Sequence, residues 1–473
     1  MVFDEAVESL GGSMCEKLLV GDTKHRRLTI EKMGKPSVVA SDAVIYTTFA
    51  VFLLVGTAVA WRVRGSAAGE LLSSNGRKTA FPLALNLMAS ALGAGILFAY
   101  PEMATVTGLQ GLIIYAVASA LPLLLLGFVV GPAIRRRCPS GFVLTQWTEE
   151  RYGREAMVYL SLVTLATLFL YMVAELSAMG HVVEALTGTG KGVLLIALLL
   201  VSGISVGVSS EALKPSLLSS AGLLSPSLLG WQLLYILPVA ITTNAFFLSS
   251  FWLRIFASRT DADLRLGSTL AAFVVACVLA AVGATGLVAV GTGAWPESPE
   301  DKGSRALFAL LERLPAAVVC LVLVMVVCLS TAMLDSLQSA MVSSASNDIF
   351  GNRLAPRYVR GLVIVVIVPV IIVALKGVSV LQIYLISDLL SAATIPILCL
   401  GLLDKMHWLR GTDVIAGGLG GLFSVFVFGW LYLGSAAEGG KLLILEDLYS
   451  KDWRTFGAFA AAPLGEGGRW MGC

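Results

Sequence analysis

Polar side chains are concentrated at the end of one otherwise apolar stretch. They are Ser330, Thr331, Asp335, Ser336, Gln338, Ser339, Ser343 and Ser344. On a helix, residues 336, 339 and 343 share one face and Asp335 adjoins it. A face of oxygen atoms could coordinate a small cation inside a membrane, where an ionisable residue usually serves a function. Alternatively, the stripe emerges into water, since Arg353 lies only 18 residues after Asp335.

Small residues interrupt a second apolar stretch. They are Ala89, Ala91, Gly93, Ala94 and Gly95, and Pro101 follows them. Little side-chain bulk and a missing backbone donor would let a helix unwind here. Unwinding frees carbonyl oxygens at membrane depth, where a small hard cation such as sodium could satisfy them. Close helix packing is the other interpretation, because Ala89 and Gly93 are four residues apart, as are Ala91 and Gly95.

Four further polar residues fall inside apolar stretches: Glu102, Glu175, Asn244 and Asp388. An ionisable residue at membrane depth is a candidate for a solute or ion contact. Each of the four could instead form a hydrogen bond between helices, and for Asn244 we favour that interpretation.

The composition predicts that these residues lie in a membrane. Hydrophobic residues make up 57% of the 473 residues and charged residues only 14%, where a soluble domain carries roughly a quarter of charged residues. Eleven stretches are long enough to cross a bilayer. They are Ala43–Trp61, Phe81–Tyr100, Leu112–Ile134, Val158–Met179, Val193–Val208, Leu229–Leu248, Leu270–Val290, Ala316–Met333, Gly361–Leu375, Val380–Leu403 and Val414–Leu433.

These stretches are continuously apolar rather than alternating, so they predict helices and not the strands of a barrel. We expect an all-α polytopic membrane protein. Its polar N-terminal tail covers residues 1–42, one transmembrane domain covers 43–433, and a C-terminal tail covers 434–473.

Basic loops give two conflicting orientations under the rule that Lys and Arg stay in the cytoplasm. The loops around Arg77 and Arg135 belong to one group, and the loops around Arg259, Arg357 and Lys405 to another. Three predicted spans separate the two groups, which would place them on opposite faces. A helix is therefore missing or miscounted between Glu155 and Leu253, or a re-entrant segment lies within 214–230.

Four separate stretches carry a family resemblance. Asn75–Gly108 (NGRKTAFPLALNLMASALGAGILFAYPEMATVTG) and Val143–Gly153 (VLTQWTEERYG) resemble the first core helix and a cytoplasmic signature of the sodium:solute symporters. Phe251–Gly267 (FWLRIFASRTDADLRLG) is similar to the loop after that family's core helix six. Cys328–Phe350 (CLSTAMLDSLQSAMVSSASNDIF) resembles its core helix eight. The FWLRIFAS region is most similar to the fungal-type urea and polyamine permease branch.

The resemblance implies an inverted-repeat fold of five plus five helices, with a sodium site between core helices one and eight. By alignment, Ala89 and Leu92 would supply sodium-binding carbonyls, and Gly93, Gly95 and Ile96 would border the substrate. Ser330 and Thr331 match the family's hydroxyl pair best. Two other registers are open: one places the pair near Ala332, and the other places it at Asp335 and Ser336. With Asp335 in the site, proton coupling becomes an alternative to sodium.

This chain also departs from the family pattern. The stretch Gly192–Gly207 reads as the start of one core helix joined to the end of the next, in the same interval where the charge count fails. No span follows Leu433. We therefore expect a fold that lacks one helix of the first repeat and the last helix, as an incomplete gene model or a splice variant would.

The sequence contains no complete enzyme or metal-binding motif. Seven scattered cysteines lack CxxC spacing, three histidines are dispersed, and Thr187–Gly192 lacks the spacing of a phosphate loop. The sequence predicts no enzyme, no nucleic-acid partner and no cofactor beyond a coupling Na⁺ or H⁺.

We expect a plasma-membrane symporter that imports a small polar solute, with urea or a related amine or polyamine the leading prediction. Glu175, Asn244 and Asp388 are the predicted solute contacts. The alternative is a non-transporting membrane sensor or a truncated isoform of such a symporter.

Overall fold

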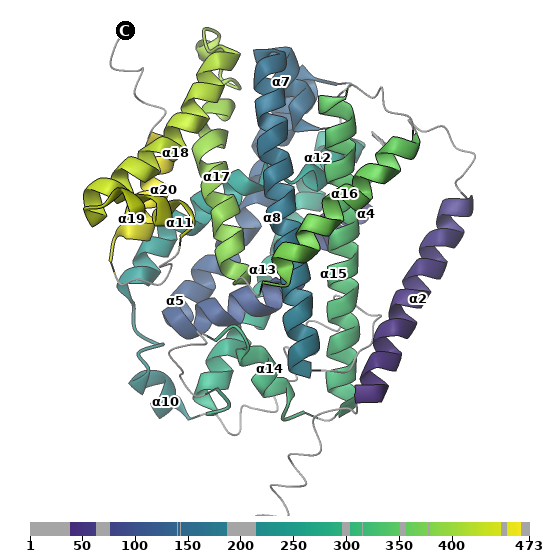
Figure 1. Cartoon of the computed structure of the whole chain (residues 1–473), viewed down its shortest axis with the longest axis vertical. Helices are drawn as coiled ribbons and strands as arrows, with labels where there is room; N and C mark the ends of the chain where they lie inside the picture. Colours follow the sequence, from purple (N-terminus) through teal and green to yellow (C-terminus); the bar gives the residue numbers. More distant parts are fainter. Residues whose placement is uncertain are drawn as a thin grey trace, which may run out of the picture.

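The computed structural model describes residues 38–62, 76–139, 141, 143–186, 214–295, 303–314, 316–350, 356–376, 379–445 and 452–464. The predicted span Val193–Val208 lies outside the described residues. Figure 1 shows a bundle of helices, most of them running along the longest axis of the molecule.

Helices account for the regular structure of the described residues, apart from one isolated bridge between Lys78 and Ser258. Their bounds are α2 Val38–Arg62, α4 Ala80–Ala91, α5 Ile96–Leu125, η1 Leu126–Val130, α6 Gly131–Arg137, α7 Leu144–Tyr152, α8 Arg154–Leu186, α10 Pro215–Ser220, α11 Leu228–Ala245, α12 Ser249–Ala257, α13 Asp261–Gly291, α14 Ala306–Leu311, α15 Ala316–Ser344, η2 Ala345–Ile349, α16 Pro356–Ala374, α17 Val380–Leu400, η3 Asp404–Met406, α18 Gly411–Leu433, α19 Ala436–Leu443 and α20 Arg454–Leu464. In this part of the chain, seven helices are long and apolar enough to cross a membrane. The prediction of an all-α polytopic protein is confirmed.

The predicted break in the second apolar stretch is present. Helix α4 ends at Ala91, Leu92 has an extended backbone with φ −109° and ψ 98°, and α5 begins at Ile96. Within α5, Gly108 has φ 68° and ψ −158°, a conformation that only glycine adopts readily. A Cβ atom on Gly108 would lie 2.1 Å from the carbonyl oxygen of Leu223. The backbone therefore changes course at Leu92 and again at Gly108, and since Lys78 and Arg135 both contact Ser258, the chain returns to the end from which it started.

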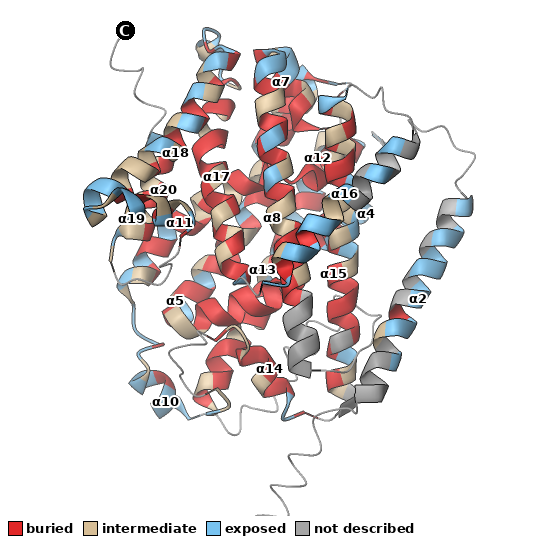
Figure 2. Ribbon diagram, in the orientation of Figure 1, coloured by how far each residue is buried: buried red, intermediate tan, exposed pale blue. Residues whose placement is uncertain are grey.

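The break is surrounded by helices from distant parts of the sequence. Helix α13 packs along α4 and α5, α11 packs against α5 and α17, and α8 packs against both α15 and α17. Buried residues are concentrated where these helices meet, as Figure 2 shows in red. Because backbone at membrane depth must be enclosed by protein, this packing is what makes the unwound segment tolerable.

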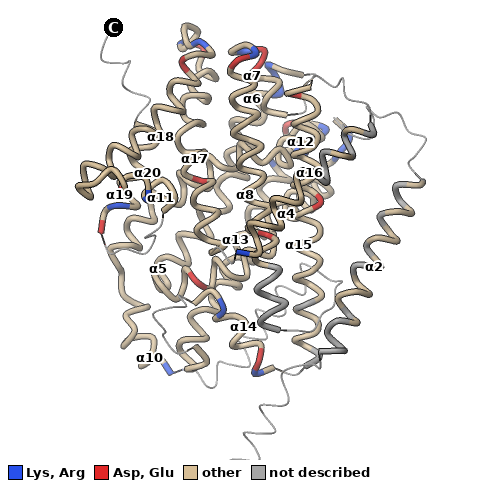
Figure 3. Tube along the Cα trace, in the orientation of Figure 1, with Lys and Arg blue, Asp and Glu red and all other residues tan. Residues whose placement is uncertain are grey.

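The basic loops gather at one end of the molecule. Arg135 and Arg136 both pair with Asp261, at N–O distances of 3.3 and 3.2 Å, and Arg137 pairs with Asp404 at 2.7 Å. Arg151 donates to the carbonyl of Met406 at 2.8 Å. Figure 3 shows this basic end beside α6, α7 and α12. The two groups of loops therefore lie on the same face.

Three crossings between the two groups would have placed them on opposite faces, so the count of three is wrong, as the conflict between the basic loops indicated. Helix α13 begins at Asp261 at the basic end, and the amide of Lys214 donates to the carbonyl of Gly291 at its other end, at 2.9 Å. Helix α8 runs toward the same far end (Figure 1). The described chain therefore stops after α8 and resumes at Lys214 at the same end of the molecule.

Two short helices, α19 and α20, lie within the predicted C-terminal tail, where no helix was predicted. Helix α20 packs against α18, α17 and α11. Gln232 of α11 donates to the carbonyl of Asp452 at 3.0 Å, just before α20 begins. At 11 residues, α20 is shorter than a membrane span.

Candidate functional site

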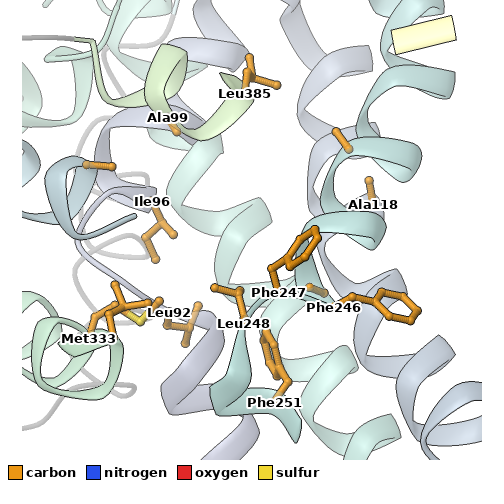
Figure 4. Packing of buried hydrophobic residues seen from close by; sticks show 14 of the residues in the cluster. Leu92, Ile96, Ala99, Ala118, Phe246, Phe247, Leu248, Phe251, Met333 and Leu385 are labelled. Carbon is orange, nitrogen blue, oxygen red and sulfur yellow. The ribbon is translucent and has the colours of Figure 1, made fainter. Parts of the chain in front are cut away.

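A cavity of about 120 Å³ lies beside the unwound segment. Its polar side chains include two acids and four tyrosines: Tyr100, Tyr115, Tyr171, Glu175, Tyr384 and Asp388. They come from α5, α8 and α17, three helices that the fold brings together around the break. Ile96, Leu248, Phe251 and Met333 form an apolar part of the wall, and Figure 4 shows them from close by.

The carboxylate of Glu175 is bound to the unwound segment. Its Oε2 accepts a hydrogen bond from the amide of Ala94 at 2.9 Å, and its Oε1 accepts a longer one from the amide of Gly95 at 3.4 Å. Tyr384 donates its hydroxyl to Oε1 at 2.9 Å. Gly95 is the N-cap of α5 and Ala94 directly precedes it, so the acid also interacts favourably with the positive end of that helix.

Two glycines make this arrangement possible. A Cβ atom on Gly93 would lie 2.0 Å from Oε1 of Glu175, and one on Gly95 would lie 2.1 Å from the hydroxyl of Tyr384. Both distances are far below van der Waals contact. Gly93 and Ile96, two of the residues predicted to border the substrate, line the cavity, and the third, Gly95, lies against the hydroxyl of Tyr384.

The second acid, Asp388, is held by α11. Asn244 donates its Nδ2 to Oδ1 of Asp388 and, at 3.2 Å, to the hydroxyl of the neighbouring Ser387. Asp388 and Asn244 are both buried, and Asp388 lines the cavity. Asn244 is therefore the helix-to-helix hydrogen bonder that we favoured, and its place next to Asp388 puts it at the edge of the predicted solute site.

The four tyrosines form two pairs. The rings of Tyr100 and Tyr115 stack with centroids 3.9 Å apart, and those of Tyr171 and Tyr384 lie 4.9 Å apart at 51°. Aromatic faces attract cations through the ring quadrupole. The sequence reading missed all four, because an aromatic residue in a continuously apolar helix looks like core. One signal was present: Tyr384 and Asp388 are four residues apart, hence on one helix face.

The predicted ion-binding residues are only partly brought together. Leu92 and Ser330 are buried, and Ser330 Oγ has no hydrogen-bond partner among the described residues. Helix α15 packs against α4, and Figure 4 draws its Met333, one turn from Ser330, near Leu92. Ala89 is exposed.

The other hydroxyls predicted for the ion site bond to their own helix. Thr331 donates to the carbonyl of Val327 at 2.6 Å and Ser336 to that of Ala332 at 2.8 Å. Asp335 is exposed, so the structure does not place it with the buried Ser330. In the described part of the chain, no group of three or more His, Cys, Asp or Glu residues could hold a metal ion.

An all-helical membrane domain with a helix unwound beside a buried polar cavity defines a secondary transporter. The fold is that of a Na⁺-coupled sialic acid symporter whose structure was solved in a substrate-bound, outward-open state. The two share a TM-score of 0.63 and 14% sequence identity, over 90% of this chain and 96% of that one.

The sequence is 44% identical to the spermidine transporter DUR31 of Candida albicans, over 92% of this chain and 89% of the relative. The chain belongs to the family of this transporter, a group of sodium:solute symporter-like proteins. No family model matches it. Both similar proteins are transporters, in agreement with the prediction that the chain is not an enzyme. The alignment has 468 positions, but 92% of the 473 residues of this chain cannot fill all of them. The relative therefore contains internal residues that have no counterpart here.

Proposed function

We propose that this protein is a cation-coupled symporter that imports a polyamine such as spermidine across the plasma membrane. The observation that carries this proposal is the pair of buried acids, Glu175 and Asp388, in one cavity with four tyrosines. Buried charges are costly unless they are paired, so a cavity with two acids favours a ligand with more than one positive charge. The name of the Candida relative supports the same solute.

The geometry suits a chain of ammonium groups better than urea. Tyr384 and Asp388 are one helical turn apart, which corresponds to about 5–6 Å between Cβ atoms, and Tyr384 is bonded to Glu175. Two acids arranged in this way could each bind one ammonium group, and the tyrosine rings could cover the methylene groups between them. Urea is neutral, so it would leave both acids unpaired. Neither similar protein supports urea as the solute.

Coupling is tested together with the solute. Purified protein in liposomes is expected to accumulate labelled spermidine when an inward Na⁺ or H⁺ gradient is imposed, and excess unlabelled urea is expected to leave that uptake unchanged. Comparing the two gradients identifies the coupling ion. Binding of spermidine without accumulation under either gradient would favour the non-transporting sensor instead.

The ion site that we propose lies between Leu92 and Ser330. Replacing Ser330 and Thr331 together with alanine is expected to raise the sodium concentration for half-maximal spermidine uptake by about 30-fold, because each of the two lost oxygen ligands costs about 1 kcal/mol. The maximal rate at saturating sodium is expected to change less. An unchanged sodium dependence would exclude these two hydroxyls from the site.

A further inference from the structure

An anion could bind at the start of α5, but this position is occupied by a side chain of the protein itself, that of Glu175. The amides of Ala94 and Gly95 donate to the Glu175 carboxylate directly before the first helical segment of α5, which runs from Ile96 to the break at Gly108. Such an end is a ready site for a carboxylate or phosphate. Glu175 therefore occupies the place at which the carboxylate of an anionic or zwitterionic solute would bind.

The carboxylate leaves no space for a second anion at these amides. Gly93 passes so close that even a methyl group would lie 2.0 Å from Oε1 of Glu175. The acid is 1% exposed and is also held by the hydroxyl of Tyr384. A solute could reach the two amides only after Glu175 had moved away.

The charge of Glu175 is not cancelled by a neighbouring base. Within the described residues, its hydrogen bonds come from two amides and one tyrosine hydroxyl, and it forms no ion pair. A carboxylate has about four lone-pair positions, of which these donors use three. The cavity therefore holds a carboxyl group that no base among the described residues neutralises, with one acceptor position left for an ammonium donor.

We propose that Glu175 determines the charge of the solute: it blocks the α5 amides against carboxylates and offers its own carboxylate to an ammonium group. This inference rests on the proposed function, because it explains why an organic cation would be selected in this fold. Glu175 therefore determines which of two solutes binds, and not only how tightly one of them binds.

The test compares two ligands that differ mainly at one end. Putrescine carries ammonium groups at both ends of a short chain, whereas 4-aminobutyrate carries a carboxylate at one end. Binding of each labelled compound to purified protein is measured for the wild type and for Glu175→Ala, Glu175→Gln and Glu155→Ala. Glu155 is an exposed acid at the start of the same helix, so its variant controls for the loss of one charge.

The wild type and Glu155→Ala are expected to prefer putrescine by at least 100-fold. Glu175→Ala is expected to reduce this preference at least tenfold and to bind 4-aminobutyrate more tightly than the wild type does, since the amides are vacated. A gain of binding cannot come from misfolding. Glu175→Gln is expected to lose putrescine binding without gaining 4-aminobutyrate, because the glutamine side chain still fills the position.

The inference is overturned when Glu175→Ala keeps the wild-type preference, or when it binds both ligands more weakly by the same factor. If the alanine variant does not fold, the isosteric Glu175→Gln decides, and retention of the wild-type preference in that variant contradicts the proposal. Failure of the wild type to bind either spermidine or putrescine would instead reject the proposed function.

Discussion

Replacing Asp388 with asparagine is expected to raise the half-saturation concentration for spermidine uptake by roughly 100-fold. Removing one member of a buried, hydrogen-bonded charge pair costs about 2–5 kcal/mol, and 1.4 kcal/mol corresponds to a factor of ten. The variant also places an amide next to Asn244, whose Nδ2 then loses its charged acceptor. The measurement is the concentration dependence of spermidine uptake into liposomes.

Two variants control this result. Asp404→Asn removes a carboxylate that is 96% exposed and paired with Arg137, and we expect it to change uptake by less than threefold, as for most surface ion pairs. Asp388→Glu keeps the charge and is expected to retain part of the activity. If Asp388→Asn transports spermidine within threefold of wild type, Asp388 does not contact the solute.

Replacing Gly93 with alanine is expected to reduce transport by about 100-fold, because displacing a binding group by about 1 Å can have an effect of that size. The new Cβ atom would overlap with Oε1 and Cδ of Glu175, at 2.0 and 2.7 Å. The acid is buried and held by three hydrogen bonds, so relieving the overlap must break some of them. Uptake rate at saturating solute is the quantity to compare.

A second substitution separates this cause from general damage. Glu175→Asp shortens the side chain by one methylene, and in combination with Gly93→Ala it is expected to restore part of the lost transport. Gly361→Ala is the matched control, since a Cβ atom at that position would meet no heavy atom within 4 Å. A double variant no better than Gly93→Ala alone would argue against the steric explanation.

The break and the two acids could be predicted from the sequence, for a common reason. Small residues followed by Pro101 remove side-chain bulk and a backbone donor, which lets a helix change course, and an acid at membrane depth is rare without a function. Glu175 and Asp388 therefore stand out among apolar neighbours. Their partners do not, because a backbone amide carries no sequence signal.

The surroundings of the tyrosines and of the polar residues on α15 were harder to predict. Tyr100, Tyr115 and Tyr171 are apolar enough to pass as core, and only the fold brings them to one cavity. For Asp335 the error was the reverse, because it was predicted to lie in a site and the structure does not place it there. Its helical phase relative to Ser336 was known, but which face of α15 turns toward α4 was not, and the structure leaves Asp335 exposed. Position within a helix does not reveal what surrounds that helix.

The order of the site residues along the chain has a consequence for how the protein enters the membrane. An ionised side chain near the centre of an inserting helix costs about 3 kcal/mol on insertion scales. Both acids follow a hydrogen-bond donor that is synthesised earlier: the amides of Ala94 and Gly95 precede Glu175, and Asn244 precedes Asp388. Each charged helix can therefore leave the translocation machinery with a partner already in the bilayer, while Tyr384 joins Glu175 only as a late contact.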